Sequence, residues 1–118
     1  LRALVSQWIA EPSCHAVLIT GGTGFTGRDS TPEAITPLLD KLMPGFGELF
    51  RALSYAEIGT SALQSRAFAG LANGTIIAAL PGSTNACRLA WTQILQHQLN
   101  TATRPCNLAQ LRERFFEH

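Results

Sequence analysis

The chain has 118 residues, of which 46% are apolar, and its formal net charge is +1. This length fits one domain with one core. The small net charge gives no sign of the basic surface that binding to nucleic acids or membranes requires. No apolar run reaches the length of a membrane span. Cys14, Cys87 and Cys106 are too widely spaced for a zinc pattern or a disulfide framework, which favours reduced thiols in a cytoplasmic protein.

The first third of the chain predicts a helix, a strand, a glycine-rich turn and a second helix. Leu1–Ala10 has helical apolar spacing, and Cys14–Ile19 is a short continuous apolar run, typical of a buried strand. The turn covers Thr20–Ser30. The following Thr31-Pro32-Glu33 supplies an N-cap, a first-position proline and a first-turn acid for the second helix.

The middle of the chain holds two prolines that bear on the course of this second helix. Pro37 conflicts with a helix interior, so the helix either kinks there or restarts with Thr36-Pro37 as a second cap and first position. Pro44-Gly45 is expected to end it. A further helix is predicted over Gly47–Tyr55, with Leu49 facing inward.

The second half of the chain predicts a β-hairpin and another strand-to-helix turn. The apolar runs Ala67–Leu71 and Thr75–Leu80 are joined through Asn73-Gly74, which is a strong hairpin signal. The second run leads through Pro81-Gly82-Ser83 into a helix whose apolar stripe includes Trp91, which we expect in the core. A last helix is predicted within residues 108–116.

The alternation of strands and helices predicts a three-layer α/β domain. In open α/β sheets, ligands bind beyond the carboxyl ends of the strands. Both glycine turns, at residues 20–24 and 81–83, follow such ends. They line one pocket if their two strands run parallel, while the hairpin requires at least one antiparallel strand.

The turn Thr20-Gly21-Gly22-Thr23-Gly24 is the candidate for an anion site. Successive glycines let backbone N–H groups converge on one point, and Asp29 can hold a cation such as Mg²⁺ against a bound phosphate. A dinucleotide site also matches the glycine spacing of Gly22–Gly27, but it needs a helix directly afterwards, and Arg28-Asp29-Ser30 intervenes. A P-loop needs a lysine after the glycines, whereas the single lysine is Lys41. The plain alternative is a tight turn that uses glycines for steric reasons alone.

Five motifs follow one another along the chain. They are Thr20–Gly24 with Arg28–Ala34, then Pro44–Glu48, Gly59–Ser61 with Leu63–Arg66, Leu80–Ser83, and the tail Thr103–Asn107. In this order they resemble the molybdopterin-binding signature of the MoaB/MogA family of molybdenum-cofactor biosynthesis, and the tail is typical of the MoaB branch. The resemblance spans nearly the whole chain.

The resemblance implies a doubly wound, three-layer α/β fold with a mainly parallel sheet and a β-hairpin. It implies binding of molybdopterin and Mg²⁺-ATP in an oligomer, usually a trimer, and adenylyl transfer from ATP to the terminal phosphate of molybdopterin. Family members carry a strand, a helix and a further catalytic aspartate ahead of this first helix, so residues 1–118 are expected to form one domain that lacks this front portion. The alternatives are a non-catalytic molybdopterin-binding or scaffolding relative, and the related domain of nicotinamide-nucleotide amidases, which fits the tail less well.

Asp29 is the candidate for catalysis and for metal binding. The alternatives are that it accepts hydrogen bonds from N–H groups of a pterin ring, or that it only forms an Asx-turn or caps a helix. The candidate substrate-binding residues are Thr20, Gly21, Gly22, Thr23, Gly24, Thr31, Glu33, Glu48, Arg66, Pro81, Gly82 and Ser83. The helix dipole explains Glu33 and Glu48 equally well, and an N-cap explains Ser83 while its neighbouring N–H groups can still hold an anion. Arg66 can clamp a phosphate through two parallel hydrogen bonds, or it can lie at the surface or in a subunit contact.

Overall fold

A computed structural model describes residues 1–117. Within them lies one four-stranded sheet in the order β1-β4-β3-β2. The strands are β1 (Ala16–Thr20), β2 (Lys41–Leu42), β3 (Phe68–Ala72) and β4 (Thr75–Leu80). β1 pairs in parallel with β4, whereas β3 pairs antiparallel with both β4 and β2. Three of these four strands therefore run in one direction, which confirms the mainly parallel sheet with a hairpin, although only the β1–β4 pairing is itself parallel.

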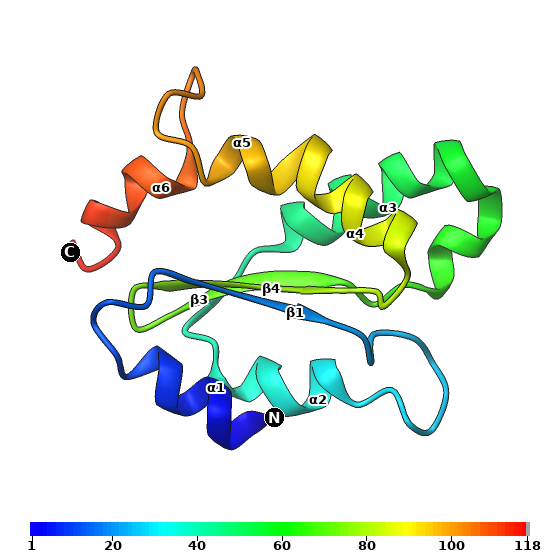
Figure 1. The fold of residues 1–118 in the computed structure, drawn as a ribbon, viewed down its shortest axis with the longest axis horizontal. Helices are drawn as coiled ribbons and strands as arrows, with labels where there is room; N and C mark the ends of the chain where they lie inside the picture. The colour runs from blue at the N-terminus through cyan, green and yellow to red at the C-terminus, as the bar shows by residue number, and fades with distance from the viewer. Residues whose placement is uncertain (118) are drawn as a thin grey trace.

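Helices cover both faces of this sheet, which confirms the three-layer α/β architecture (Figure 1). On one face lie α1 (Arg2–Ile9) and α2 (Thr31–Ile35), and on the other lie α3 (Pro44–Ile58), α4 (Thr84–Ala90) and α5 (Gln96–Gln98). A π-helical turn over Trp91–Leu95 joins α4 to α5, and α6 (Leu108–Leu111) belongs to the tail. None of the helices in residues 1–117 combines the length and apolar character that a bilayer crossing requires.

Two apolar cores, one on each face of the sheet, hold the layers together. Val5, Val17, Ile19, Ile35 and Ile77 are buried between the sheet and the α1–α2 layer. Phe46, Phe50, Ala78, Leu80, Ile94 and Leu95 are buried on the α3–α4 side. Neighbouring residues of β4 enter opposite cores because side chains alternate along a strand. All of β4 is buried, since both of its faces are covered.

The predicted hairpin is confirmed. Ala72 pairs with Thr75, so the loop consists of the two residues Asn73 and Gly74, whose φ angles are 49° and 79°. Positive φ at both positions is what a type I′ turn requires, and asparagine and glycine tolerate it best. The ring of Phe116 lies against Gly74, where an added Cβ would come within 2.9 Å of it. The tail therefore packs onto the body of the domain at this turn.

The expectation that the first strand is fully buried is wrong. β1 lies at the edge of the sheet, and its burial alternates along the strand. Val17 and Ile19 enter the α1–α2 core, whereas Leu18 on the opposite face is 44% exposed. A continuous apolar run therefore does not distinguish a covered strand from one whose second face is open.

The segment between α2 and α3 also differs from the prediction. The helix does restart at Thr36-Pro37, but as a short 3₁₀ turn that ends at Leu38. Lys41–Leu42 then forms β2 rather than helix, flanked by hydrogen bonds from the Asp40 and Met43 N–H groups to β3. Pro44 begins α3 instead of ending the earlier helix, since a missing N–H costs nothing at a first helical position.

Two apolar side chains predicted to face the core are exposed instead. Leu49 on α3 is 48% exposed, while Phe46 and Phe50 of the same helix reach the core. Trp91 is 44% exposed although Ile94 and Leu95 are buried. The π-helical turn begins at Trp91 and breaks the 3.6-residue period on which the prediction depended.

Candidate functional site

The turns after β1 and β4 lie side by side at one edge of the sheet. Thr20 and Leu80 are register partners, and the Gly21 N–H donates to the Leu80 carbonyl at 2.8 Å. An added Cβ on Gly82 would lie 3.5 Å from the Gly21 Cα. The condition for a shared pocket, that the two strands run parallel, is met.

A cavity of about 260 Å³ lies between these turns and α3. Seven of the predicted site residues line it: Gly22, Thr23, Gly24, Asp29, Pro81, Gly82 and Ser83. The other lining residues are Phe50, Ser54, Ile58, Ser61, Gln64, Ser65 and Ala86. The structure brings both turns to one cavity but does not bring all of the predicted residues there. Thr20, Gly21, Thr31, Glu33, Glu48 and Arg66 lie outside the lining.

The carbonyl groups of Gly21, Gly22, Thr23 and Gly24 all accept hydrogen bonds from within the protein. The Thr31 hydroxyl donates to the Gly21 carbonyl at 2.8 Å, and the Thr31 N–H donates to the Gly22 carbonyl at 3.1 Å. Arg66 donates its backbone N–H to the Thr23 carbonyl and its Nε to the Gly24 carbonyl, each at 2.8 Å. Gly21 and Gly22 adopt φ angles of +95° and +72°, which side chains disfavour.

Unlike these carbonyl groups, two N–H groups of the same turn have no hydrogen-bond partner among the described residues. The Gly21 N–H bonds to β4, but the N–H groups of Gly22 and Thr23 donate to no acceptor within residues 1–117. A trans peptide plane points its carbonyl and the following N–H in opposite directions. The turn therefore presents donors without competing acceptors, which is the requirement for an anion cradle.

Asp29 lies on the cavity wall beside this cradle. Its Oδ2 accepts from the Thr26 hydroxyl at 2.7 Å and from the Thr26 N–H at 2.9 Å. These bonds, led by the hydroxyl, hold the pKa of Asp29 below its usual value, with smaller contributions in the same direction from the Gly24 N–H and the Arg66 charge. The Asx-turn role expected as an alternative therefore occupies Oδ2 of Asp29. The other oxygen, Oδ1, accepts no hydrogen bond from the described residues. The contribution of Thr26 was not predicted, and its only sequence signal is a threonine three residues ahead of the aspartate.

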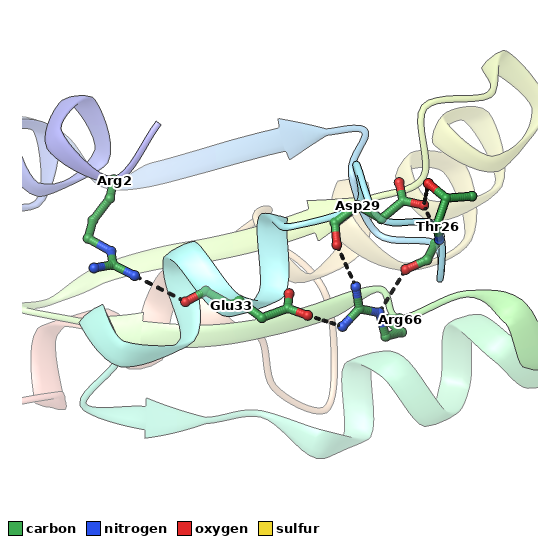
Figure 2. A network of polar contacts seen from close by, with 6 residues as sticks. Arg2, Thr26, Asp29, Glu33 and Arg66 are labelled. Carbon is green, nitrogen blue, oxygen red and sulfur yellow. Dashed lines mark hydrogen bonds and ion pairs between the residues drawn. The ribbon is translucent and has the colours of Figure 1, made fainter.

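Arg66 and Glu33 form a polar network with Asp29 beneath the turn, drawn in Figure 2. Arg66 Nη2 donates to the Asp29 carbonyl at 2.8 Å, and Nη1 pairs with Glu33 Oε1. The hydrogen bond from Arg66 is the main reason that the pKa of Glu33 lies below its usual value. On its other side, the Glu33 carbonyl accepts from Arg2 at 3.2 Å. The guanidinium predicted to clamp a phosphate therefore binds the protein itself.

Three other predicted residues have roles that the structure defines. The N-cap of α2 is Ser30 rather than Thr31, whose hydroxyl instead binds the glycine turn. Ser83 is the N-cap of α4 as expected, and its Oγ accepts from the Ala86 N–H at 3.2 Å. Glu48 is exposed on α3, whereas Phe50 of the same helix faces the cavity.

The residues of the cavity wall opposite the turns were not among the candidate substrate-binding residues, although Ser61, Gln64 and Ser65 belong to one of the five motifs of the resemblance. This wall is formed by Phe50, Ser54 and Ile58 of α3 and by the 3₁₀ segment Gly59–Gln64 with Ser65. The α3 part of the wall, Phe50, Ser54 and Ile58, belongs to none of the motifs. The wall combines apolar and hydroxyl groups, a composition suited to a ligand with both a ring and polar substituents.

The side chains at the cavity can bind Mg²⁺ only if a phosphate supplies further oxygen ligands. Residues 1–117 contain no cluster of three or more histidine, cysteine, aspartate or glutamate side chains that could enclose a metal ion. Mg²⁺ commonly uses one or two carboxylates and completes its shell with phosphate oxygens and water. Asp29 Oδ1 beside the anion cradle matches that pattern.

Comparison with known proteins gives consistent matches. A family model described as a probable molybdopterin binding domain matches residues 1–101. Molybdenum cofactor biosynthesis protein B of Escherichia coli (strain K12) is 61% identical over 107 residues, which cover 91% of this chain and 63% of the relative. The protein of the same name from Staphylococcus carnosus (strain TM300) is 52% identical over 97 residues, covering 81% of this chain and 56% of the relative.

Solved structures give the same result. A crystal structure of molybdenum cofactor biosynthesis protein B superposes with a TM-score of 0.79 at 43% identity, covering 83% of this chain and 62% of the other. The tungsten cofactor synthesizing protein MoaB from Pyrococcus furiosus gives a TM-score of 0.71 at 40% identity, covering 80% and 62%. The chain spans less than two thirds of the length of these relatives.

Proposed function

This chain belongs to the family of probable molybdopterin binding domains, and we propose that its cavity binds molybdopterin by the terminal phosphate in molybdenum cofactor biosynthesis. One observation carries the proposal. The carbonyls of Gly21–Gly24 are all engaged by Thr31 and Arg66. The N–H groups of Gly22 and Thr23, two residues that line the cavity, donate to no acceptor within residues 1–117. An anion satisfies free donors of this kind, and the serine-lined wall opposite supplies partners for a polar ring.

We further propose adenylyl transfer as the reaction. A phosphate oxygen of molybdopterin attacks the α-phosphorus of ATP, a new P–O bond forms, and the bond to pyrophosphate breaks. The free N–H groups of Gly22 and Thr23 would hold and orient the attacking phosphate. Mg²⁺ bound at Asp29 Oδ1 would neutralise charge on the phosphates. Because hydrogen bonds keep the pKa of Asp29 low, the carboxylate is ionised at neutral pH and available for this role.

A second candidate function is molybdopterin binding without transfer. The cavity of about 260 Å³ is smaller than a typical small-molecule site of about 300–1,000 Å³, so it accommodates one ligand end rather than two ligands. Among the described residues, Asp29 is also the only carboxylate on the cavity lining. A scaffolding or carrier role needs no second carboxylate.

The proposal also covers the oligomeric state of the protein and its location in the cell. Leu1, which precedes α1, and Leu4 and Trp8 on α1 are 57%, 47% and 41% exposed, and exposed apolar side chains of this size favour association with another copy. We propose a homo-oligomer, with a trimer favoured, in the cytoplasm. Light scattering over a range of protein concentrations measures the assembly, and a monomer at all concentrations would contradict it.

The test of the reaction is Asp29→Ala. We expect adenylyl transfer to fall about 100-fold or more, as when an electrostatic group is removed from a transition state, while unfolding free energy changes by about 1 kcal/mol or less. Pyrophosphate release with molybdopterin and ATP measures the rate, and a melting curve measures the stability.

Asp40→Ala is the matched control for this test. Like Asp29, Asp40 is an aspartate whose side chain accepts a backbone N–H, here from Asn73 at 2.7 Å, but Asp40 is exposed and lies at the hairpin end of the sheet. Equal transfer rates in the Asp29 variant and the parent would remove Asp29 from the mechanism. Molybdopterin binding without any pyrophosphate release in the parent would favour the second candidate function.

A further inference from the structure

We propose that Arg66 is a positioning residue that fixes the distance between the anion cradle and the Asp29 carboxylate; the proposal rests on the proposed function of this cavity. Three different nitrogens of one guanidinium bind three different parts of the site. Nε donates to the Gly24 carbonyl and Nη2 to the Asp29 carbonyl, each at 2.8 Å, while Nη1 pairs with Glu33. One rigid planar group thereby connects the end of the glycine turn to the residue that carries the carboxylate.

The division of labour between Thr31 and Arg66 makes the proposal specific. Thr31 binds the carbonyls of Gly21 and Gly22, and so orients the N–H groups of Gly22 and Thr23. Arg66 binds the carbonyls of the next two residues, Thr23 and Gly24. Thr31 therefore shapes the anion cradle, whereas Arg66 sets where the loop that carries Asp29 lies relative to it.

The surroundings of Arg66 limit its movement. Its side chain is 26% exposed, and the Phe25 ring lies over the guanidinium with 5.2 Å from the ring centroid to Cζ. Glu33 holds Nη1 from α2, a different element from the loop. Figure 2 shows the chain of contacts from Arg2 through Glu33 and Arg66 to Asp29 and Thr26. Arg66 does not line the cavity, so it acts through Asp29 rather than on the ligand.

Arg66→Lys is the informative substitution because it keeps the charge and removes the planar fork. A single ammonium cannot reach the Gly24 and Asp29 carbonyls and the Glu33 carboxylate in the same geometry. Arg51→Lys is the matched control. Arg51 is also half-buried and donates to two carbonyls, those of Ser65 and Ala67, without touching the glycine turn.

Amide hydrogen exchange tests the positioning directly and needs no ligand. The Thr26 N–H bonds to the Asp29 carboxylate, and the Asp29 N–H bonds to the Thr26 carbonyl. We expect both amides to exchange about tenfold faster in Arg66→Lys, while the Thr31 N–H, which bonds to Gly22, keeps its protection. Arg51→Lys should leave all three unchanged. Unchanged exchange of Thr26 and Asp29 in Arg66→Lys overturns the proposal, as does equal loss at Thr31, which would mean general loosening of the turn.

Calorimetric titration with molybdopterin, with and without Mg²⁺, tests the consequence for the site. In Arg66→Lys we expect affinity without Mg²⁺ to stay within about twofold of the parent, and the gain on adding Mg²⁺ to fall about tenfold. An undiminished Mg²⁺ gain contradicts the positioning role. If the parent protein binds no molybdopterin, the proposed function fails, and the exchange measurement still decides whether Arg66 positions Asp29.

Discussion

The two turns that line the cavity are built in opposite ways. The turn after β4 is held by local contacts, since Ser83 caps α4 through the Ala86 N–H and the Cys87 thiol lies 3.2 Å from the Pro81 carbonyl. The turn after β1 depends on Thr31 and Arg66, and Arg66 is 42 residues from the Gly24 that it binds. The first turn is therefore shaped by the whole fold and the second by its own sequence.

This difference explains where each turn places its glycines. In the first turn, Gly21 and Gly22 have positive φ, and a Cβ on Gly22 would overlap the Thr31 hydroxyl. In the second turn, Gly82 has an ordinary φ, and an added Cβ would meet the Gly21 Cα at a normal contact distance. Glycine is required at Gly22 by its backbone conformation and by Thr31, whereas neither constraint applies at Gly82.

The largest expected effect comes from Gly22→Ala. We expect a loss of about 3 kcal/mol in unfolding free energy, of which about 1–2 kcal/mol comes from the left-handed backbone and the rest from overlap with Thr31. The loss comes from contact with the protein itself, because an added Cβ on Gly22 overlaps the Thr31 hydroxyl, and it does not depend on a bound phosphate. Denaturant unfolding measures the loss.

Two further variants separate the causes. Gly27→Ala, on the same loop but with no atom near its added Cβ, should change stability by no more than about 0.5 kcal/mol. In a Thr31→Ala background, Gly22→Ala should cost less unfolding free energy, because the hydroxyl that the added Cβ overlaps is absent. A Gly22→Ala protein as stable as the parent would contradict the idea that the first turn is constrained by the fold.

Gly82→Ala should have an intermediate effect, on binding alone. Its Cβ has room at 3.5 Å from Gly21, so we expect stability to stay within about 0.5 kcal/mol. Gly82 lines the cavity, and we expect the added methyl group to lower molybdopterin affinity about tenfold, or about 1.4 kcal/mol. Calorimetric titration measures the affinity, with Gly27→Ala as the control. Undiminished binding would place the ligand away from the second turn.

The smallest expected effect is on how the stability of the protein depends on pH in acid. The pKa of Glu33 is lowered chiefly by the Arg66 hydrogen bond, so the unfolded chain binds a proton there more readily than the folded one. Its contribution to stability is complete above its usual pKa of 4.5 and is lost as pH falls below that value. Glu33→Gln should therefore be less stable than the parent at pH 7, and this difference should shrink below pH 4.5.

Melting curves between pH 7 and pH 3 measure this dependence. Glu57→Gln is the control, because Glu57 is an exposed carboxylate of α3 that forms no ion pair within residues 1–117. A parent-to-variant difference that is the same at every pH would show that the Glu33 charge does not hold Arg66.

Much of the fold could be predicted because its signals are local. Asn73-Gly74 specifies its own turn, and Ser83 caps the helix that directly follows it. β2 was missed because a two-residue strand has no period, and its pairing with β3 depends on residues far along the chain. Trp91 was misplaced because a π-helical turn leaves no signal in apolar spacing.

In the candidate site, too, the features with local sequence signals could be predicted and those that depend on distant residues could not. The glycine turn, Asp29 and Ser83 were identified from short motifs, and their meeting at one cavity followed from a parallel β1–β4 pair. The role of Arg66 could not be predicted, because its partners lie between Thr23 and Glu33 and only folding brings them together. The assignments of Glu48, of the metal and of the trimer remain predictions.

The parallel pairing of β1 with β4 also bears on the order of folding. Ala16 pairs with Ile76, sixty residues later, whereas β3 and β4 are joined by two residues. A hairpin of this kind forms in about 1–10 μs, while contacts between distant segments wait for a long loop to close. We therefore expect β3 and β4 to associate first and β1 to dock afterwards. The ligand site, which needs β1 in place, would be among the last parts of the domain to acquire its native form.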